Sequence, residues 1–456
     1  MVEFLPLVLF AAVFVALLAG YAVAPTLAGV ALLFAFAGAA FGVFDLSDLG
    51  FLPSRLYGIV TNQTLIAVPL FVLMGVTLER TRIAATLLES LSMLMGRLAG
   101  GLGMAVTVVG MLLAASTGIV GATVVTMGLL ALPTMLRHGY DARLAAGTIC
   151  ATGTLGQIIP PSIALVLLGD VLSSAYSEAQ LSQGVFSPKT VSVGDLFAGS
   201  LLPGLVLVGL YLAYIATVAL LKPERAPGRS DARPGDGVLP QLLKGLAPPM
   251  LLIVAVLGSI LAGYATPTEA AGVGALGAVL LAVAYRSLSF PVVKDICRST
   301  LKTTAMVFFI LIGASVFSLV FRGYGGDDLV QGLFEDMPGG VWGATAIVMV
   351  VIFVLGFILD FVEITYVVVP IVAPVLLAMG LDPVWLGVLI AVNLQTSFLT
   401  PPFGFALFYL RGVAPPQVAT LDIYRGVVPF VALQIVLMAV LVLAPQLATW
   451  LPSVLY

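Results

Sequence analysis

The chain has 456 residues, of which 61% are hydrophobic and only 9% are charged. A soluble domain carries about 25% charged residues, so the composition excludes a soluble protein and predicts a polytopic membrane protein. The net charge of −3, with scattered basic residues, argues against nucleic-acid binding. The two cysteines, Cys150 and Cys297, are too few for a disulfide framework or a metal cluster.

Long apolar stretches follow one another along the whole chain. A helix needs about 20 such residues to cross roughly 30 Å of hydrocarbon. About ten stretches meet this requirement, which predicts an all-α protein with about ten transmembrane helices. In chain order, the expected spans are residues 4–22, 24–43, 64–79, 144–175, 196–221, 247–263, 269–285, 303–320, 384–410 and 427–450.

Two further apolar stretches, 102–136 and 341–379, are too long for one span and lack a polar loop suited to two. Each has a polar or glycine-rich break near its middle, STGIVGAT at 116–123 and LDFVEIT at 359–365. An arm of about 15 residues rises about 22 Å, which passes the middle of the membrane without crossing it. Both stretches are therefore predicted to be re-entrant helical hairpins.

The basic residues support this topology. If the first hairpin enters from the inside and the second from the outside, only Arg55, Lys189 and Arg322 lie outside, and the other 16 of the 19 Lys and Arg lie inside. This asymmetry is what the positive-inside rule requires. Both termini are then expected on the outer side of the membrane.

The chain also repeats itself. TGTLGQIIPPS, beginning at Thr152, has a partner in NLQTSFLTPPF, beginning at Asn393, and aligning their proline pairs sets an offset of 241 residues. Five spans and one hairpin in each half make the second copy enter from the opposite face, which predicts an inverted-topology repeat. The expected halves are residues 1–221 and 247–456, joined by a cytoplasmic linker at 222–246 that is rich in proline, glycine and charge.

The proline pairs Pro160, Pro161 and Pro401, Pro402 interrupt a membrane helix in each half. A proline removes a backbone donor and disrupts the bond to the carbonyl four residues earlier. In the first half these are the carbonyls of Gly156 and Gln157, which need another partner or a cavity in lipid. Carbonyls and hydroxyls suit a hard cation such as Na⁺, and helix N-termini suit a carboxylate.

Asp360 and Glu363 lie in the break of the second hairpin. An acidic residue at the centre of a span costs about 2.5–3.5 kcal/mol, so such residues are usually paired or functional. They are candidates for binding a cation, and Glu363 is also a candidate proton carrier. The alternative is that Asp360 only caps the second arm.

Each candidate cation site combines a hairpin tip with a broken helix. The first consists of Ser116, Thr117 and Gly118 at the tip, with Thr152, Gly153 and Thr154 facing them. The symmetry-related second site consists of Asp360, Glu363 and Thr365 with Asn393, Thr396, Ser397 and Thr400. The alternative for each hydroxyl is a bond to the carbonyl four residues earlier.

Three further residues are candidate contacts for a substrate carboxylate. Thr123 and Ser162 each begin a helix just after a break, and Gly121 lies in the first tip. For Thr123 and Ser162, an ordinary role as helix N-caps is the alternative.

GTLGQIIPPS, the GYD before it, GATVVTMGLLALP in the first hairpin and VNLQTSFLTPP in the second half resemble the large membrane subunit of tripartite ATP-independent periplasmic (TRAP) transporters. The likeness covers nearly the whole chain. It implies Na⁺-coupled import of an organic acid, mostly a carboxylate, across the bacterial inner membrane by an elevator movement, with both termini periplasmic. It also implies two partners, a periplasmic substrate-binding protein and a small four-helix membrane subunit, the latter expected to be a separate polypeptide. No cofactor besides the coupling ion is implied.

Both hairpin tips depart from the pattern of this family. Many members have roughly SGSSPAT in the first tip and DMTPA in the second, where this chain has STGIVGAT and DFVEIT. Since the tips contact substrate and ion in the resemblance, the sequence does not predict which organic acid is carried.

Other classes of protein fit less well. An ATP-driven pump needs a P-loop, and no GxxxxGK[ST] occurs. An intramembrane enzyme is disfavoured because the sequence has no HExxH, no GxSxG and a single histidine. A stand-alone Na⁺- or H⁺-coupled carboxylate symporter is the closest alternative, and dependence on a binding protein would distinguish it.

Overall fold

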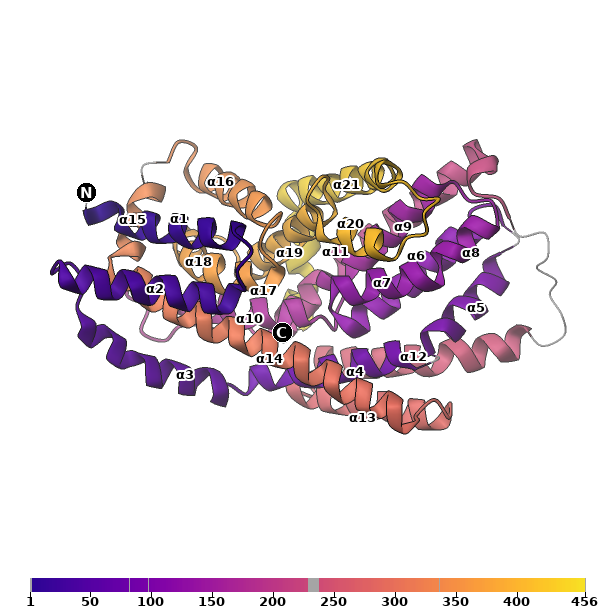
Figure 1. Cartoon of the computed structure of the whole chain (residues 1–456), viewed down its shortest axis with the longest axis horizontal. Coiled ribbons are helices and arrows are strands. Elements are labelled where there is room, and N and C mark those ends of the chain that lie inside the picture. Colours follow the sequence, from indigo (N-terminus) through magenta and orange to yellow (C-terminus); the bar gives the residue numbers. More distant parts are fainter. Residues whose placement is uncertain (1, 82, 97, 229–237, 336, 456) are drawn as a thin grey trace. The chain divides into compact units, whose positions relative to one another are not determined.

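The computed structural model describes all residues except 1, 82, 97, 229–237, 336 and 456. The described residues form helices joined by short connections and contain no β-strand (Figure 1). Seven of the described helices are long and apolar enough to cross a membrane, or up to eight if a bent pair forms one span. The protein is therefore an all-α, multi-pass membrane protein.

Two of the seven, Val120–Arg137 and Phe361–Ala378, are second arms of the predicted hairpins and not members of the ten expected spans. Several of those ten consist of shorter helices. Residues 4–22 form a helix of only 14 residues, α1 (Leu5–Leu18). The expected spans 144–175 and 384–410 are each divided by their proline pair, into α9 (Ala142–Thr154) and α10 (Ile163–Ser182), and into α19 (Pro383–Leu399) and α20 (Phe405–Val413).

The chain forms two compact units, and each is described by itself. Unit 1 consists of Met1–Leu65, Leu167–Ser192 and Lys302–Pro383, and unit 2 of Ile66–Val166, Val193–Leu301 and Val384–Tyr456. Each unit takes segments from both halves of the sequence. The boundaries of the compact units therefore differ from those of the predicted sequence repeat. The halves 1–221 and 247–456 remain a prediction.

Unit 1 is built from helices of the N-terminal region and of the second hairpin. It contains α1, α2 (Val23–Ala40), α3 (Leu52–Thr61), most of α10, the second part of α14 (Phe290–Gly323), α15 (Gly326–Glu335), α16 (Gly340–Leu355), α17 (Phe361–Glu363), a π-helix (Ile364–Val368) and α18 (Val369–Ala378).

Unit 2 contains the first hairpin and most of both broken helices. Its other helices come from the middle and the end of the chain. The members are α4 (Ala67–Arg80), α5 (Ile83–Met95), α6 (Gly101–Thr117), α7 (Val120–Leu130), α8 (Leu132–Arg137), α9, α11 (Val193–Leu221), α12 (Val238–Leu261), α13 (Pro267–Ala284), α19, α20, α21 (Thr420–Leu443) and α22 (Gln446–Leu455).

Helix α9 contacts five other helices of unit 2, namely α6, α7, α8, α20 and α21 (Figure 1). Every residue from Leu144 to Thr154 is buried. Small residues permit this dense packing, as they do generally between membrane helices. At Gly147 there is no room for a side chain, because a Cβ would collide with the carbonyl oxygen of Gly426 on α21.

Both expected hairpins have two helical arms with a break between them. The first break lies within the expected residues 116–123, and the second begins three residues before the expected 359–365. In the first, α6 ends at Thr117, and the next residue, Gly118, has a φ of 60° and reverses the chain before α7. In the second, α16 ends before the break at 356–360, and the chain continues through α17, the π-helix and α18. The arms of each hairpin contact one another. A re-entrant path of these hairpins through the membrane remains a prediction.

The expected linker, 222–246, is only partly a linker. Residues 229–237 lie outside the described residues, and α12 already begins at Val238, well before the expected span at 247. Helix α12 thus begins within the predicted linker, and the division of the chain at 222–246 remains a prediction.

Candidate functional site

The first broken helix is interrupted at residues 155–162 by a 3₁₀ turn (Leu155–Gln157) and the proline pair. The Ser162 hydroxyl donates a hydrogen bond of 2.6 Å to the carbonyl oxygen of Gly156 and lies 3.4 Å from that of Gln157. These are the two carbonyls that the prolines were predicted to leave without a donor. The peptide bonds within both proline pairs are cis.

This hydrogen bond bears on the suggested role of Ser162. The residue is fully buried, and a hydroxyl has one hydrogen to donate. That hydrogen is used by the backbone, so contact with a substrate carboxylate would require the bond to Gly156 to break. The role of Ser162 in substrate binding stays a prediction.

The first hairpin packs directly along the broken helix. A Cβ on Gly118, at the tip, would lie 2.9 Å from the backbone nitrogen of Ile163, the first residue of α10. A Cβ on Gly156 would lie 2.7 Å from the carbonyl oxygen of Ala114. The tip therefore lies against the segment from 156 to 163.

The predicted facing residues, Thr152 to Thr154, lie against the arms of this hairpin. A Cβ on Gly110 of α6 would be 2.7 Å from the Cβ of Thr152, and Gly153 contacts Val124 of α7. Gly121 packs against the ring of Tyr409 on α20. The side chains of Ser116 and Thr117 lie outside the described residues.

The hydroxyls of Thr152 and Thr154 in the first site, and that of the candidate substrate contact Thr123, bond to the preceding turn of their own helix. Thr152 Oγ1 donates to the Thr148 carbonyl at 2.8 Å, Thr154 Oγ1 to that of Ala151 at 2.8 Å and Thr123 Oγ1 to that of Ile119 at 3.3 Å. A donating hydroxyl keeps lone pairs that can accept another bond or coordinate a cation. Intrahelical bonding is thus compatible with the predicted role.

The second broken helix contributes buried polar residues of the same kind to unit 2. Thr396 Oγ1 donates to the Val392 carbonyl at 2.8 Å, and Thr400 Oγ1 donates to the Thr396 carbonyl at 2.7 Å. Asn393 and Ser397 are buried beside them.

Two glutamines that the sequence analysis did not single out join this polar core. Gln395 Nε2 donates to Thr154 Oγ1 at 3.3 Å and so connects the two broken helices. The amide oxygens of Gln395 and Gln157 are buried, and in the described part of the chain neither has a hydrogen-bond partner. An amide group in the middle of an apolar span was the signal that could have identified both.

The second hairpin tip contains a capping box. Asp360 Oδ1 accepts the Phe361 backbone N–H at 2.8 Å, and Glu363 Oε2 accepts the Asp360 N–H at 3.0 Å. Glu363 is buried, whereas Asp360 is exposed. The hydroxyl of Thr365 is buried without a hydrogen-bond partner among the described residues. Capping, the structural alternative for Asp360, is therefore observed.

The structure divides the second predicted site between the two units. Asp360, Glu363 and Thr365 lie in unit 1, whereas the segment 393–400 lies in unit 2. The first predicted site lies entirely in unit 2, where its hairpin and helix contact each other.

Unit 1 contains a polar cavity of about 430 Å³ between α3, α10, α14 and the π-helix. Asn62 Nδ2 donates to Asp170 Oδ1 at 2.8 Å in its wall, and the Tyr366 side chain lines it as well. Asp170 lies in an apolar run, VLLGDVL, so the rule that drew attention to Asp360 could also have identified it.

Two arginines, Arg55 and Arg322, also line this cavity. Arg322 forms ion pairs with Glu178 at 3.0 Å and with Asp327 at 3.2 Å. Asp327 lies on α15, outside the expected spans; burial raises the pKa of its carboxyl, and Arg322 opposes the rise. Arg55 lines the same cavity, and no ion pair joins it to another described residue.

Comparison with known proteins shows which family this chain belongs to. The sequence model of the family described as "Tripartite ATP-independent periplasmic transporter, DctM component" matches residues 10–447. The chain is 30% identical over 413 residues to the C4-dicarboxylate TRAP transporter large permease protein DctM of Pseudomonas aeruginosa, covering 90% of this chain and 91% of that protein. It is 28% identical to the ectoine TRAP transporter large permease protein TeaC of Halomonas elongata, covering 86% and 87%.

Solved structures share the fold at low sequence identity. The YdaH transporter of Alcanivorax borkumensis superposes with a TM-score of 0.59 at 14% identity, covering 89% of this chain and 91% of that one. MtrF of Neisseria gonorrhoeae superposes with a TM-score of 0.59 at 15% identity, covering 86% and 82%.

The family match spans nearly the whole chain, and the sequence relatives are transporter permease subunits rather than enzymes. The chain therefore belongs to the tripartite ATP-independent periplasmic transporter family, as a large permease (DctM) component.

Proposed function

We propose that this chain is the large transmembrane subunit of a Na⁺-coupled secondary transporter that imports an organic acid across the bacterial inner membrane. The observation that carries this proposal is the buried polar core of unit 2, where the two broken helices meet at Gln395 and Thr154. Interrupted helices with unsatisfied oxygens are where transporters of this kind bind their ions and substrates. Both termini lie in the periplasm in this proposal.

The oxygen atoms of this core are suitable ligands for Na⁺. The amide oxygens of Gln157 and Gln395 have no hydrogen-bond donor among the described residues, and a buried acceptor without a partner is costly. The hydroxyls of Thr152 and Thr154 have lone pairs to spare after donating to the backbone. Amide and hydroxyl oxygens are neutral, hard ligands, so a bound Na⁺ would supply the charge that these acceptors lack.

The second hairpin tip provides candidates for a further cation. Asp360 and Glu363 share a capping box, and the Thr365 hydroxyl close by in sequence is buried without a partner among the described residues. Two carboxylates so close together repel each other, and a cation would relieve that repulsion.

The cavity in unit 1 suits the substrate. Arg322 is already compensated by Glu178 and Asp327, whereas Arg55 has no such partner among the described residues. A guanidinium binds a carboxylate through two parallel hydrogen bonds, so Arg55 is the candidate for the acid group. An elevator movement, in which the part of the chain that binds the acid moves through the membrane against the rest, would then carry the acid across.

The partners of the proposed transporter follow from the family. Its description calls the transporter tripartite, and the relatives are called large permease proteins. These names support a small four-helix membrane subunit and a periplasmic binding protein that delivers the acid. The names of relatives include C4-dicarboxylate and ectoine transporters, which supports a small organic solute without choosing one.

A Na⁺ titration of the purified chain tests the cation sites without substrate or partners. Thermal unfolding is recorded in detergent as Na⁺ replaces K⁺ or choline at constant ionic strength. Binding to the folded state alone stabilises it by RT ln(1 + [L]/Kd), so a saturable rise in Tm with Na⁺ is expected. Gln395→Met should weaken the effect, whereas Gln183→Met, at an exposed glutamine, should not. Identical curves in Na⁺ and K⁺ would contradict Na⁺ binding by this chain and favour proton coupling.

A further inference from the structure

Unit 2 contains a second polar cavity, of about 440 Å³, between α9, α11 and α21. Four cationic side chains line it, from Arg143, Lys222, Arg225 and Arg425. Apolar side chains line it as well, among them Val218, Leu221 and Pro429. This cavity has no part in the ion or substrate sites proposed above.

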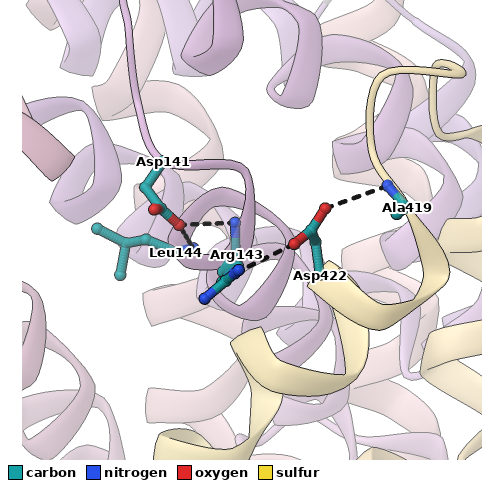
Figure 2. A network of polar contacts seen from close by, with 5 residues as sticks. All are labelled: Asp141, Arg143, Leu144, Ala419 and Asp422. Atoms are coloured by element: carbon teal, nitrogen blue, oxygen red, sulfur yellow. Dashed lines mark hydrogen bonds and ion pairs between the residues drawn. The ribbon is translucent and has the colours of Figure 1, made fainter.

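The acidic groups around the cavity are already engaged (Figure 2). Asp141 Oδ1 accepts the backbone N–H groups of Arg143 at 2.8 Å and Leu144 at 3.2 Å, which caps α9. Asp422 accepts Arg143 Nε at 3.1 Å and, with its other oxygen, the Ala419 N–H at 3.3 Å. Both carboxylates are thus held at the N-terminal turns of their helices.

The remaining cations are not neutralised by these groups. Four cationic side chains against two carboxylates leave a surplus of two positive charges. Lys222, Arg225 and Arg425 form no ion pair with other described residues. Glu224, in the same short turn as Arg225, is exposed and does not line the cavity. The cavity therefore attracts an anion.

The surroundings show which kind of anion fits. Leu220 and Leu221, the last residues of α11, are 82% and 75% exposed, directly before Lys222. All four cations belong to the side that the sequence places in the cytoplasm. An apolar helix surface that ends in a basic rim matches a molecule with apolar chains and an anionic head. A small soluble anion would leave the apolar side chains of the lining without a contact.

We propose that this cavity binds the phosphate headgroup of an anionic phospholipid from the cytoplasmic leaflet. Basic pockets between membrane helices on the cytoplasmic side bind such headgroups, and the forked guanidinium of arginine matches phosphate oxygens. The acyl chains lie along Val218 and Leu221. The lipid joins the ends of α9, α11 and α21, so it stabilises the part of unit 2 that carries the first broken helix.

Thermal unfolding of the delipidated full chain in detergent tests this site. Phosphatidylglycerol should raise the Tm in a saturable way, and phosphatidylcholine at the same concentration should not. Inorganic phosphate and glycerol 3-phosphate at matched concentration distinguish a lipid from a soluble anion and should have no effect. Native mass spectrometry should show phosphatidylglycerol retained on the chain.

Two double variants test whether phosphatidylglycerol binds at this cavity. Lys222→Gln with Arg225→Gln should weaken phosphatidylglycerol binding at least tenfold, while Lys222→Arg with Arg225→Lys should retain it. The matched control is Lys294→Gln with Arg298→Gln, two exposed cations of unit 2 that do not line the cavity, and it should bind normally. An equal response to phosphatidylcholine, an equal shift with phosphate alone, or equal loss in the control would overturn the proposal.

Discussion

The hydroxyl of Ser162 donates a 2.6 Å hydrogen bond to the carbonyl oxygen of Gly156, the acceptor whose usual donor is missing because residue 160 is proline. One side chain thus supplies the missing hydrogen-bond donor where the first broken helix is interrupted. The residue that directly follows the proline pair thus stabilises the break through a hydrogen bond to the backbone.

Replacement of Ser162 by alanine should therefore destabilise the protein. An unsatisfied buried acceptor costs about 1–3 kcal/mol, which thermal unfolding in detergent would show as a lower Tm. Ser182→Ala, which removes an exposed hydroxyl, should change stability by about 0.5 kcal/mol at most. If Ser162→Ala has normal stability but impaired uptake, the hydroxyl acts on substrate instead.

Gly118→Ala should be more damaging than Gly263→Ala. Both glycines have positive φ, 60° and 72°, so both variants carry a backbone penalty of about 1–2 kcal/mol. Only Gly118 is also crowded, with a Cβ 2.9 Å from the nitrogen of Ile163, whereas nothing lies within 4 Å of a Cβ on Gly263. A similar fall in Tm for the two variants would show that the tip does not pack against α10 as described.

Asp360→Ser separates the two roles of this residue. Serine is a good N-cap, so the helix start should survive, but the charge is lost. If Asp360 is a ligand, the Na⁺ concentration that gives half-maximal stabilisation or uptake should rise at least tenfold. An unchanged Na⁺ dependence in both Asp360→Ser and Asp360→Asn would leave capping as the only role of Asp360.

Arg55→Gln should raise the KM for the transported acid at least tenfold, because glutamine cannot provide a charged, bidentate contact for a carboxylate. Lys189→Gln is the control, since Lys189 is an exposed cation of the same unit that does not line the cavity. The comparison is made from initial rates of uptake. Equal kinetic constants for both variants and the unmodified chain would place the acid group elsewhere.

The helical segments and their breaks were largely predictable, because they depend on local chemistry. Proline pairs remove backbone hydrogen-bond donors wherever they occur. The helical arms of the hairpins 102–136 and 341–379 could be predicted from the length and hydropathy of these stretches. The same reasoning identified Gly156 and Gln157 as carbonyls in need of a partner. It did not identify Ser162 as that partner, because the chain path through a break is not encoded in periodicity.

Contacts between distant segments were not predictable from one sequence. Asp170 bonds to Asn62, and Gln395 bonds to Thr154, only because the fold brings their helices together. A polar residue within an apolar span has a free-energy cost of burial that a hydrogen bond must offset. The sequence alone does not show which residue provides that bond. For the same reason the sequence could not show that the second hairpin tip and the residues 393–400 belong to different compact units.

Uptake into liposomes tests the central claim most directly. The chain is reconstituted with its small membrane subunit and supplied with its binding protein and a panel of labelled acids that includes a C4-dicarboxylate and ectoine. We expect uptake of at least one compound under an inward Na⁺ gradient, little uptake under an equal K⁺ gradient, and none without the binding protein. Uptake that is equally fast in K⁺ would contradict Na⁺ coupling, and uptake that needs no binding protein would show a stand-alone symporter.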